Sequence, residues 1–200
     1  MSLEETLEVT GRWIEVCSTL LNSKGFESSV RSRVSVGLLH LSIEHHRSIH
    51  FLTTQNHHGS SFALLRPQFE SYIRGLWFFN CANENQLESF LDNNEPPNIN
   101  TLITEIEKAG VFKENKLQGV KKTVWREMCG YTHGGYFQVA NRNTENDIVN
   151  DYPENNLVGL ITVSNNLSYL ALVAFARLLD NDEEILHQAT TIHKEMFNHE

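Results

Sequence analysis

The stretch Phe62–Phe79, F-A-L-L-R-P-Q-F-E-S-Y-I-R-G-L-W-F-F, decides the fold of this protein. Its large apolar residues recur at intervals of three and four, which is the repeat of an α-helix packed along one seam. Other apolar residues occupy most of the remaining faces, and a helix that is apolar nearly all round is buried. The stretch therefore predicts a buried helix of a helical bundle. The seam residues are Phe62, Leu65, Phe69, Tyr72, Leu76 and Phe79.

Helical spacing extends from this helix in both directions along the chain. No strand pattern is persuasive, and two polar stretches, 93–97 and 141–153, separate the helices as loops. We therefore expect an all-α fold, a single bundle over residues 1–200 with about five main helices and several short ones. The other helices are expected to open at the capping box Ser2-x-x-Glu5, to run over about 30–55, to follow Asn83, to run over 101–109, 116–131 and 157–179, and to open at the cap Asn181-x-x-Glu184.

Cysteine use and the N-terminus indicate a protein of the cell interior. The three cysteines are dispersed with no C-x-x-C pair, which argues against a disulfide framework and against a zinc knuckle. The N-terminus is acidic and lacks the pattern of a signal sequence. The segment 157–179 is long enough to span a bilayer, but Asn165 and Asn166 lie at its middle, where unpaired amides are unfavourable. We expect a cytoplasmic location and no membrane partner.

The charge of the chain is unevenly distributed. A formal net charge of −9 argues against nucleic-acid binding over the whole surface. Between Lys113 and Arg142, however, six basic residues stand against two acidic ones, which gives this strip a local charge of +4. The basic strip predicts one place where a phosphate-bearing partner binds.

The most informative stretch for function is Arg126–Gly135, R-E-M-C-G-Y-T-H-G-G. In one continuous helix, Arg126 and His133 differ by about 700° of rotation, so they point the same way about 10 Å apart. An arginine stabilises negative charge on a phosphate, and a histidine exchanges a proton near neutral pH. A base for the 2′-hydroxyl and a cation for the phosphorane are sufficient to cleave RNA without a metal. Tyr131 and Thr132 add two hydroxyls beside the imidazole as candidate substrate contacts.

A charged row runs down one side of the buried helix at 62–79. Arg66, Glu70 and Arg74 follow one another at intervals of four, and buried charges are costly unless they are paired. The row is either an ion-pair ladder that fixes helix packing or the floor of a site. In the second case Arg66 and Glu70 lie beside His133 and orient it or bind phosphate. The surface is then extended by Gln138 and Arg142.

Two features of these stretches have structural explanations. Pro67 has no N–H, so it is expected to leave the carbonyl of Ala63 without its helical partner and to bend the helix. His133 and the glycine after it have the alternative interpretation of a helix end, with the imidazole on a last-turn carbonyl and Arg126 in a surface ion pair.

The Arg126-x(6)-His133 pattern in an all-helical protein of this size resembles the R-x(4–6)-H signature of the HEPN superfamily. More narrowly, R-P-Q-F-E at 66–70 with Y-T-H-G-G-Y-F-Q at 131–138 resembles a largely uncharacterised bacterial family of helical proteins. The HEPN resemblance implies homodimers whose motifs face each other across a cleft, RNA cleavage without a metal or other cofactor, and a toxin or phage-defence role with an antitoxin or operon partner. The residue after the arginine departs from the pattern of active members, because it is Glu127, which can pair with Arg126.

The leading hypothesis is a HEPN-like endoribonuclease with His133 as acid and base and Arg126 on the phosphate. The runner-up is a non-catalytic helical interaction or sensor module of a defence operon, in which Arg126 serves stability or partner binding and RNA is untouched.

A third hypothesis is a metal-dependent bundle enzyme. His46, His50 and His57 share one face if their helix extends that far, and three imidazoles on one face suit zinc or nickel. That face lies about 140° around the helix from Leu41 and Leu52, so we expect it to be solvated rather than to bind metal.

Overall fold

The computed structural model describes residues 1–22, 29–112, 116–179 and 183–197. Within these residues the chain forms nine helices and no strand, with one isolated antiparallel bridge between Asn143 and Ile148. The prediction of an all-α fold is confirmed. The helices are α1 (Leu3–Leu21), α2 (Val30–Thr54), α3 (His58–Asn80), α4 (Glu84–Leu91), α5 (Ile99–Lys108), α6 (Lys116–Thr132), α7 (Tyr136–Ala140), α8 (Glu154–Leu178) and α9 (Glu183–Phe197).

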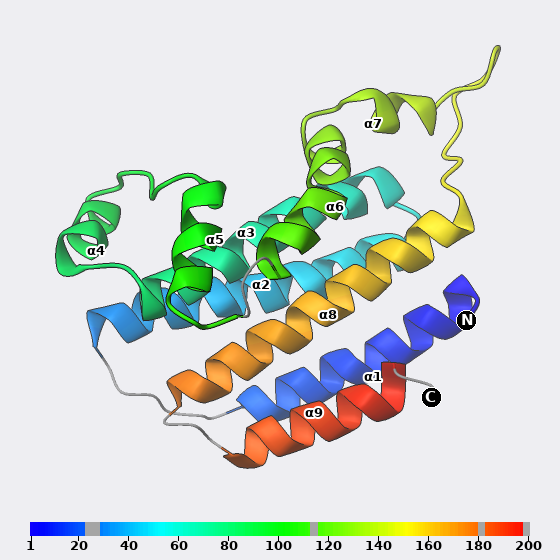
Figure 1. Ribbon diagram of the computed structural model, residues 1–200. Coiled ribbons are helices and arrows are strands. Elements are labelled where there is room, and N and C mark those ends of the chain that lie inside the picture. The colour runs from blue at the N-terminus through cyan, green and yellow to red at the C-terminus, as the bar shows by residue number, and fades with distance from the viewer. Residues whose placement is uncertain (23–28, 113–115, 180–182, 198–200) are drawn as a thin grey trace.

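The long helices α1, α2, α3, α8 and α9 lie alongside one another as a bundle (Figure 1). Helix α2 packs along α3, α8 contacts both of them, and α1 and α9 pack against α8 and against each other. Helices α5 and α6 pack on α3, and α7 packs on α6. The start of α1 and the end of α9 lie at the same end of the bundle (Figure 1).

Helix α3 is buried, as its apolar periodicity predicts. Ile73, Trp77 and Phe78 are completely buried, and each such side chain contributes about 1.5–3 kcal/mol by leaving water. A Cβ at Gly75 would lie 2.9 Å from Cγ of Leu39, so the missing side chain at position 75 lets α2 approach α3 closely. This close approach places the charged row of α3 on the opposite side, facing α5 and α6.

Helix α2 buries a different stripe from the expected one. Leu41 and Leu52 are only half-buried, whereas Ser35, Ser42 and His46 are completely buried. The prediction of a solvated histidine face is therefore wrong for His46. The physical reason is that α2 is packed between α3 and α8, where small hydroxyl side chains let the helices approach and neighbouring helices supply polar partners.

Polar contacts join α2, α3 and α8 inside the bundle. The hydroxyl of Ser164 donates to Oε1 of Gln68 at 2.7 Å, and Nδ1 of His46 lies 2.9 Å from the same hydroxyl. Because the single hydroxyl proton is directed to Gln68, His46 donates to the Ser164 hydroxyl through Nδ1. Burial, together with the nearby His50 and His193, lowers the pKa of His46 to about 3.

Helix α8 is the one helix within the described residues that is long and apolar enough to cross a membrane by length and composition. Of its most apolar window, 56% is buried inside the protein, and core helices of soluble proteins meet the same criteria. Asn165, near its middle, is buried and donates from Nδ2 to the hydroxyl of Thr10 on α1 at 2.9 Å. Length and composition therefore do not make α8 a membrane span.

The helix ends follow the sequence in most places. At α1 the Ser2 hydroxyl accepts from the Glu5 N–H at 3.2 Å and the Glu5 carboxylate accepts from the Ser2 N–H at 2.8 Å, so the predicted capping box is confirmed. Asn181, the expected cap of the last helix, lies outside the described residues. The five-residue α7 was not expected, because a single turn after two glycines has too few residues to show a helical period.

Candidate functional site

The end of α6 places His133 on the surface beside α3. The N–H of His133 bonds to the carbonyl of Cys129 at 3.1 Å, so this residue continues the last helical turn. Gly134 has a φ of 65°, the left-handed conformation that closes many helices, and the N–H of Gly135 bonds across the turn to the carbonyl of Gly130 at 2.7 Å. The two glycines therefore end the helix and leave the His133 side chain exposed.

Arg66 of α3 is the side-chain partner of His133, through a contact between Nη1 of the guanidinium and Nε2 of the imidazole. A guanidinium has only N–H donors, so Nε2 accepts and the imidazole proton is on Nδ1. The contact therefore places Nε2, the basic nitrogen of the ring, beside a permanent positive charge. Two residues that lie 67 positions apart in the sequence are brought together here.

Glu70 fixes the position of Arg66. Nε of Arg66 donates to Oε1 of Glu70 at 2.6 Å, and Nη2 of Arg74 donates to the other carboxylate oxygen at 3.4 Å. The three side chains are 22%, 19% and 33% exposed, so the row is both paired and open to solvent. The ion-pair ladder and the floor of a surface site are therefore the same set of residues.

Pro67 and Thr132 together determine how α6 meets α3. Because Pro67 has no N–H, the carbonyl of Ala63 lacks its usual helical donor, and the hydroxyl of Thr132 lies 3.2 Å from that oxygen. The same hydroxyl is 2.8 Å from the carbonyl of Met128 in its own helix. Thr132, predicted as a substrate contact, is thus engaged within the chain and positions the neighbouring His133.

Tyr131 and Gln138, two other predicted contacts, also point into the protein. The Tyr131 ring stacks on Phe62 with 4.2 Å between centroids, and burial raises the pKa of its hydroxyl. The amide of Gln138 donates to the carbonyls of Gly59 at 2.7 Å and Tyr131 at 3.0 Å, and its oxygen accepts from the hydroxyl of Tyr152 at 2.7 Å. These bonds tie α7 to α3 and α6.

A polar groove of about 410 Å³ opens next to Arg66. The charged row of α3 forms one wall, residues of α6 form the other, and the segment 95–100, which includes the start of α5, closes it. The ring of Trp125 is 4.9 Å from Cζ of Arg66 and 4.7 Å from Nζ of Lys121, measured to the ring centroid. Trp125 is also the only tryptophan that is not completely buried. The charged residues of the groove are Arg66, Arg74, Lys121, Glu70 and Glu95.

Arg126 lies outside this groove. Its exposed side chain lines an adjacent hollow together with Lys122 and the Trp125 ring, and within the described chain it makes no ion pair or hydrogen bond. The ion pair that Glu127 could form with Arg126 is therefore absent there, and the arginine that contacts His133 is Arg66. Two other residues of the basic strip are Arg142, which is exposed and lies close to Gly59, and Lys113, which lies outside the described residues.

His46, His50 and His57 do not converge on a metal position, and α2 ends at Thr54, before His57. His46 is bonded to Ser164 inside the bundle, Nε2 of His50 lies 3.0 Å from the carbonyl of Leu7, and His57 is exposed. No group of three His, Cys, Asp or Glu residues in the described ranges is placed to hold a metal ion. The geometry therefore gives no support to the metal-dependent hypothesis.

A family model described as "Family of unknown function (DUF6988)" matches residues 39–199. The chain belongs to the DUF6988 family. The matched range begins within α2 and contains Arg66, Trp125, Arg126 and His133. No curated protein and no solved structure matches the chain.

Sequence reasoning missed the role of Trp125 in this DUF6988 chain. The signal was present, because Lys121 and Trp125 are four residues apart within the basic strip and therefore share a helical face. An aromatic ring among cations is the arrangement that proteins use to hold single-stranded nucleic acid. What the sequence does not contain is the position of α3, which supplies the opposite wall of the groove.

Proposed function

We propose that this DUF6988 protein is a metal-independent endoribonuclease that cuts single-stranded RNA. The proposal rests on one observation, the contact between the Arg66 guanidinium, which lines the groove, and Nε2 of the His133 imidazole. Attack by a 2′-hydroxyl requires a base within reach of the hydroxyl and a cation at the phosphate. The resemblance of Arg126 and His133 to the HEPN signature supports the same reaction.

In the proposed reaction Arg66 exchanges the imidazole for a non-bridging phosphate oxygen, which leaves Nε2 of His133 free to take the 2′-hydroxyl proton. The 2′-oxygen forms a bond to phosphorus while the bond from phosphorus to the 5′-oxygen breaks. The products are a 2′,3′-cyclic phosphate and a 5′-hydroxyl. The leaving oxygen takes a proton from solvent, and His133 returns its proton to solvent. Glu70 keeps Arg66 at the groove throughout.

The groove suits a single strand better than a duplex. Unpaired bases can be splayed out and stacked on an aromatic ring, and such stacking contributes about 1–3 kcal/mol per base. Trp125 offers that ring, and Lys121 and Arg74 offer charge for the flanking phosphates. Arg126, exposed in the adjacent hollow, extends the positive path for the strand.

The HEPN resemblance adds the biological setting of the proposal. We place the protein in the cytoplasm as a homodimeric toxin or phage-defence effector, restrained by an antitoxin or another operon partner. In the homodimer Arg126 of each copy faces the cleft between the two motifs.

Cleavage of a labelled single-stranded RNA in the presence of EDTA tests the proposal. His133→Ala should lower the rate by roughly 10²–10⁴-fold, the usual contribution of a general base. Arg66→Ala should lower it by roughly 10²–10³-fold, and Arg66→Lys should restore part of the loss because the charge is kept. Arg12→Ala is the matched control, since this exposed arginine of α1 pairs, among the described residues, only with Glu8, at 3.9 Å.

The products and the substrate requirement of the proposed reaction can be tested directly. Products must end in a 2′,3′-cyclic phosphate, and an RNA with a single 2′-deoxy residue at the cut position must stay intact. Expression in cells of wild type, Arg126→Ala and His133→Ala adds growth and RNA integrity as readouts. Equal growth and intact RNA in all three strains, together with no cleavage in vitro, would refute the nuclease.

A second candidate function is a non-catalytic interaction module, and exposed apolar side chains around α7 favour it. Tyr136 is 79% exposed, Val139 53% and Ile148 94%. Figure 1 shows α7 and the segment after it extending away from the bundle. This function predicts that Tyr136→Ser and Val139→Ser weaken association of the protein with its binding partner in sedimentation experiments. RNA should stay intact with the wild type and with the variants.

A further inference from the structure

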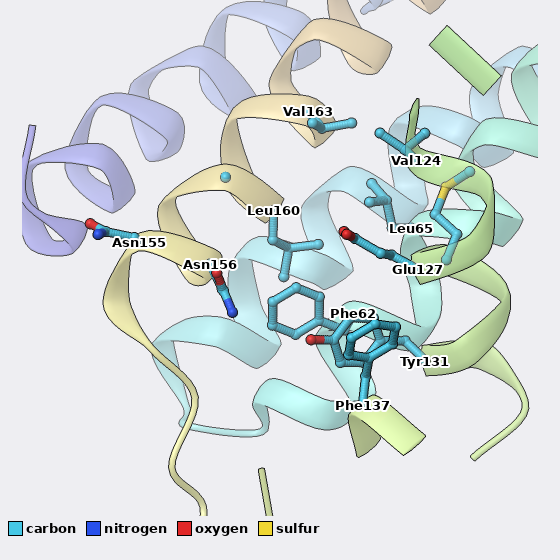
Figure 2. A pocket seen from close by; sticks show the side chains of 12 residues that line it. Phe62, Leu65, Val124, Glu127, Tyr131, Phe137, Asn155, Asn156, Leu160 and Val163 are labelled. Carbon is cyan, nitrogen blue, oxygen red and sulfur yellow. The ribbon is translucent and has the colours of Figure 1, made fainter. Parts of the chain in front are cut away.

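A pocket separate from both the groove and the hollow at Arg126 lies between α3, α6 and α8 (Figure 2). It has a volume of about 290 Å³, and no residue that lines it also lines the groove at Arg66. Helix α6 contributes to both because Val124, Met128 and Tyr131 point to one of its sides and Lys121 and Trp125 to another. A ligand can therefore occupy this pocket while the groove is empty.

The walls of the pocket are apolar. The Phe62 ring from α3 lies at its centre in Figure 2, next to Tyr131 of α6, while Leu160 and Val163 of α8 form the opposite side. The stacked rings of Phe62 and Tyr131 are 4.2 Å apart. These surfaces fit a flat ring or a short hydrocarbon chain, and a volume near the lower limit for ligand pockets restricts the ligand to one ring.

One carboxylate faces these apolar walls. Figure 2 shows Glu127 extending from α6 toward α8, with its oxygens directed into the pocket. Within the described chain Glu127 makes no ion pair or hydrogen bond, and no lysine or arginine lines the pocket. Asn156, at the start of α8, points toward the Phe62 ring and adds one amide at the rim.

This arrangement selects the charge of a ligand. A purely apolar ligand that covers the pocket removes water from the Glu127 carboxylate without replacing its hydrogen bonds, which is unfavourable, and a neutral alcohol replaces one hydrogen bond but supplies no counter-charge. An anion adds repulsion to that cost. A primary ammonium restores both the counter-charge and the hydrogen bonds, since it carries three donors and a carboxylate only accepts. Aromatic faces beside the carboxylate attract the same cation.

We infer that the pocket between α3, α6 and α8 binds a small primary amine with an apolar body, its ammonium on Glu127 and its ring or chain against Phe62 and Leu160. This site takes a cationic ligand, whereas the groove takes phosphate, so the inference does not depend on the nuclease proposal.

Isothermal titration of the full chain with 2-phenylethylamine, 2-phenylethanol and phenylacetate at pH 7 tests the inference. The three compounds share one ring and differ in charge, and the amine is protonated at this pH, as a lysine side chain is. The wild type should bind the amine at least tenfold more tightly than the alcohol or the acid.

Three variants distinguish the effect of the Glu127 charge from the effect of the pocket volume on amine binding. Glu127→Gln keeps the shape of the exposed side chain and should weaken amine binding at least tenfold, whereas Glu88→Gln on α4 removes one exposed charge elsewhere and should leave it unchanged. Gly159→Leu should abolish binding by filling the pocket. A Cβ at Gly159 meets nothing within 4 Å, and leucine favours a helix more than glycine, so this variant should fold.

Each outcome of these titrations either supports or overturns the amine site. Selective amine binding that is lost in Glu127→Gln and in Gly159→Leu, with unchanged unfolding temperatures, supports the site. Amine binding of equal strength in wild type and Glu127→Gln overturns it, as does equal binding of the alcohol or absence of amine binding at millimolar concentration. RNA cleavage is not part of the readout, so failure here leaves the nuclease proposal intact, and failure of the nuclease leaves the amine site intact.

Discussion

Replacement of Thr132 by valine tests how Pro67 and α6 position His133. Valine has nearly the same shape as threonine and a similar helix propensity, so the substitution removes little except the hydroxyl. That hydroxyl is 3.2 Å from the carbonyl of Ala63, whose helical donor is missing because residue 67 is proline. Thr132→Val therefore leaves an acceptor without a protein partner at a half-buried position.

The expected loss in the free energy of unfolding of Thr132→Val is modest and depends on which residue occupies position 67. A buried acceptor left unsatisfied costs about 1–3 kcal/mol, and partial access of water to Ala63 places the expected loss near the lower limit, at about 1 kcal/mol. Pro67→Ala restores an N–H that bonds to Ala63 within α3. In the Pro67→Ala background Thr132→Val should therefore cost almost nothing, which gives a coupling energy of about 1 kcal/mol.

Urea unfolding followed by circular dichroism gives the four free energies of unfolding that this cycle needs. Thr123→Val is the matched control, because Thr123 is on the same helix and, within the part of the chain that the structure describes, its hydroxyl bonds only to the carbonyl of Gly119, at 3.1 Å. Thr123→Val should change stability by less than Thr132→Val and should not couple to Pro67→Ala. Equal losses for Thr132→Val with proline and with alanine at residue 67 would refute the reasoning.

Three further predictions concern stability and the groove. Because burial lowers the pKa of His46 to about 3 and of His193 to about 4, the unfolded chain binds protons that the folded chain does not as the pH falls below 6.5. The free energy of unfolding should be fully retained above pH 6.5 and should fall by up to about 1.4 kcal/mol per pH unit for each histidine down to about pH 4, with a shallower slope for His46→Gln. Gly59→Ala should destabilise by about 1–2 kcal/mol, because a Cβ there lies 2.6 Å from Oε1 of Gln138, whereas Gly119→Ala, with nothing within 4 Å, should stabilise by up to about 1 kcal/mol. Single-stranded RNA should quench the fluorescence of the wild type but not of Trp125→Phe, because the other two tryptophans are completely buried.

For each of these three predictions, one experimental result would contradict it. A free energy of unfolding that stays constant between pH 6.5 and 4 would show that these histidines are not buried in the neutral form. Equal effects of alanine at the two glycines would contradict the close contact of Gln138 with Gly59. Quenching that persists in Trp125→Phe would place RNA away from the groove.

The fold was predictable from the sequence where apolar residues dominate a whole helix. Helix α3 has large apolar residues on nearly every face, so its burial follows from composition alone. Helix α2 could not be assigned in this way, because Ser35, Ser42 and His46 are buried while Leu52 is only half-buried. Polar residues are acceptable inside when a neighbouring helix supplies partners, and those partners depend on tertiary packing that periodicity does not contain.

The residues of the candidate site were predictable from the sequence, but which arginine contacts His133 was not. Helical spacing placed Arg126 and His133 on one side of a helix, and Arg66 and Glu70 formed a charged row on another. Which arginine contacts His133 depends on how α6 packs on α3, and the answer is Arg66. The hydroxyl of Thr132 contributes to this packing by its contact with the carbonyl of Ala63. The sequence indicates that Pro67 leaves this carbonyl without a helical donor, but it does not indicate which residue of another helix supplies one.

The buried polar contacts of α8 also determine how the bundle can assemble. Ser164, Asn165 and Ser168 bond to side chains of α3, α1 and α1 respectively, so each contact fixes the height of α8 relative to a neighbour. A shift of α8 by one turn, about 5.4 Å, leaves an apolar surface against an apolar surface but separates every one of these donors from its acceptor. Apolar packing tolerates such sliding, and unsatisfied buried polar groups do not. These side chains therefore select one axial register from several of similar hydrophobic energy, as a single buried asparagine does in a coiled coil.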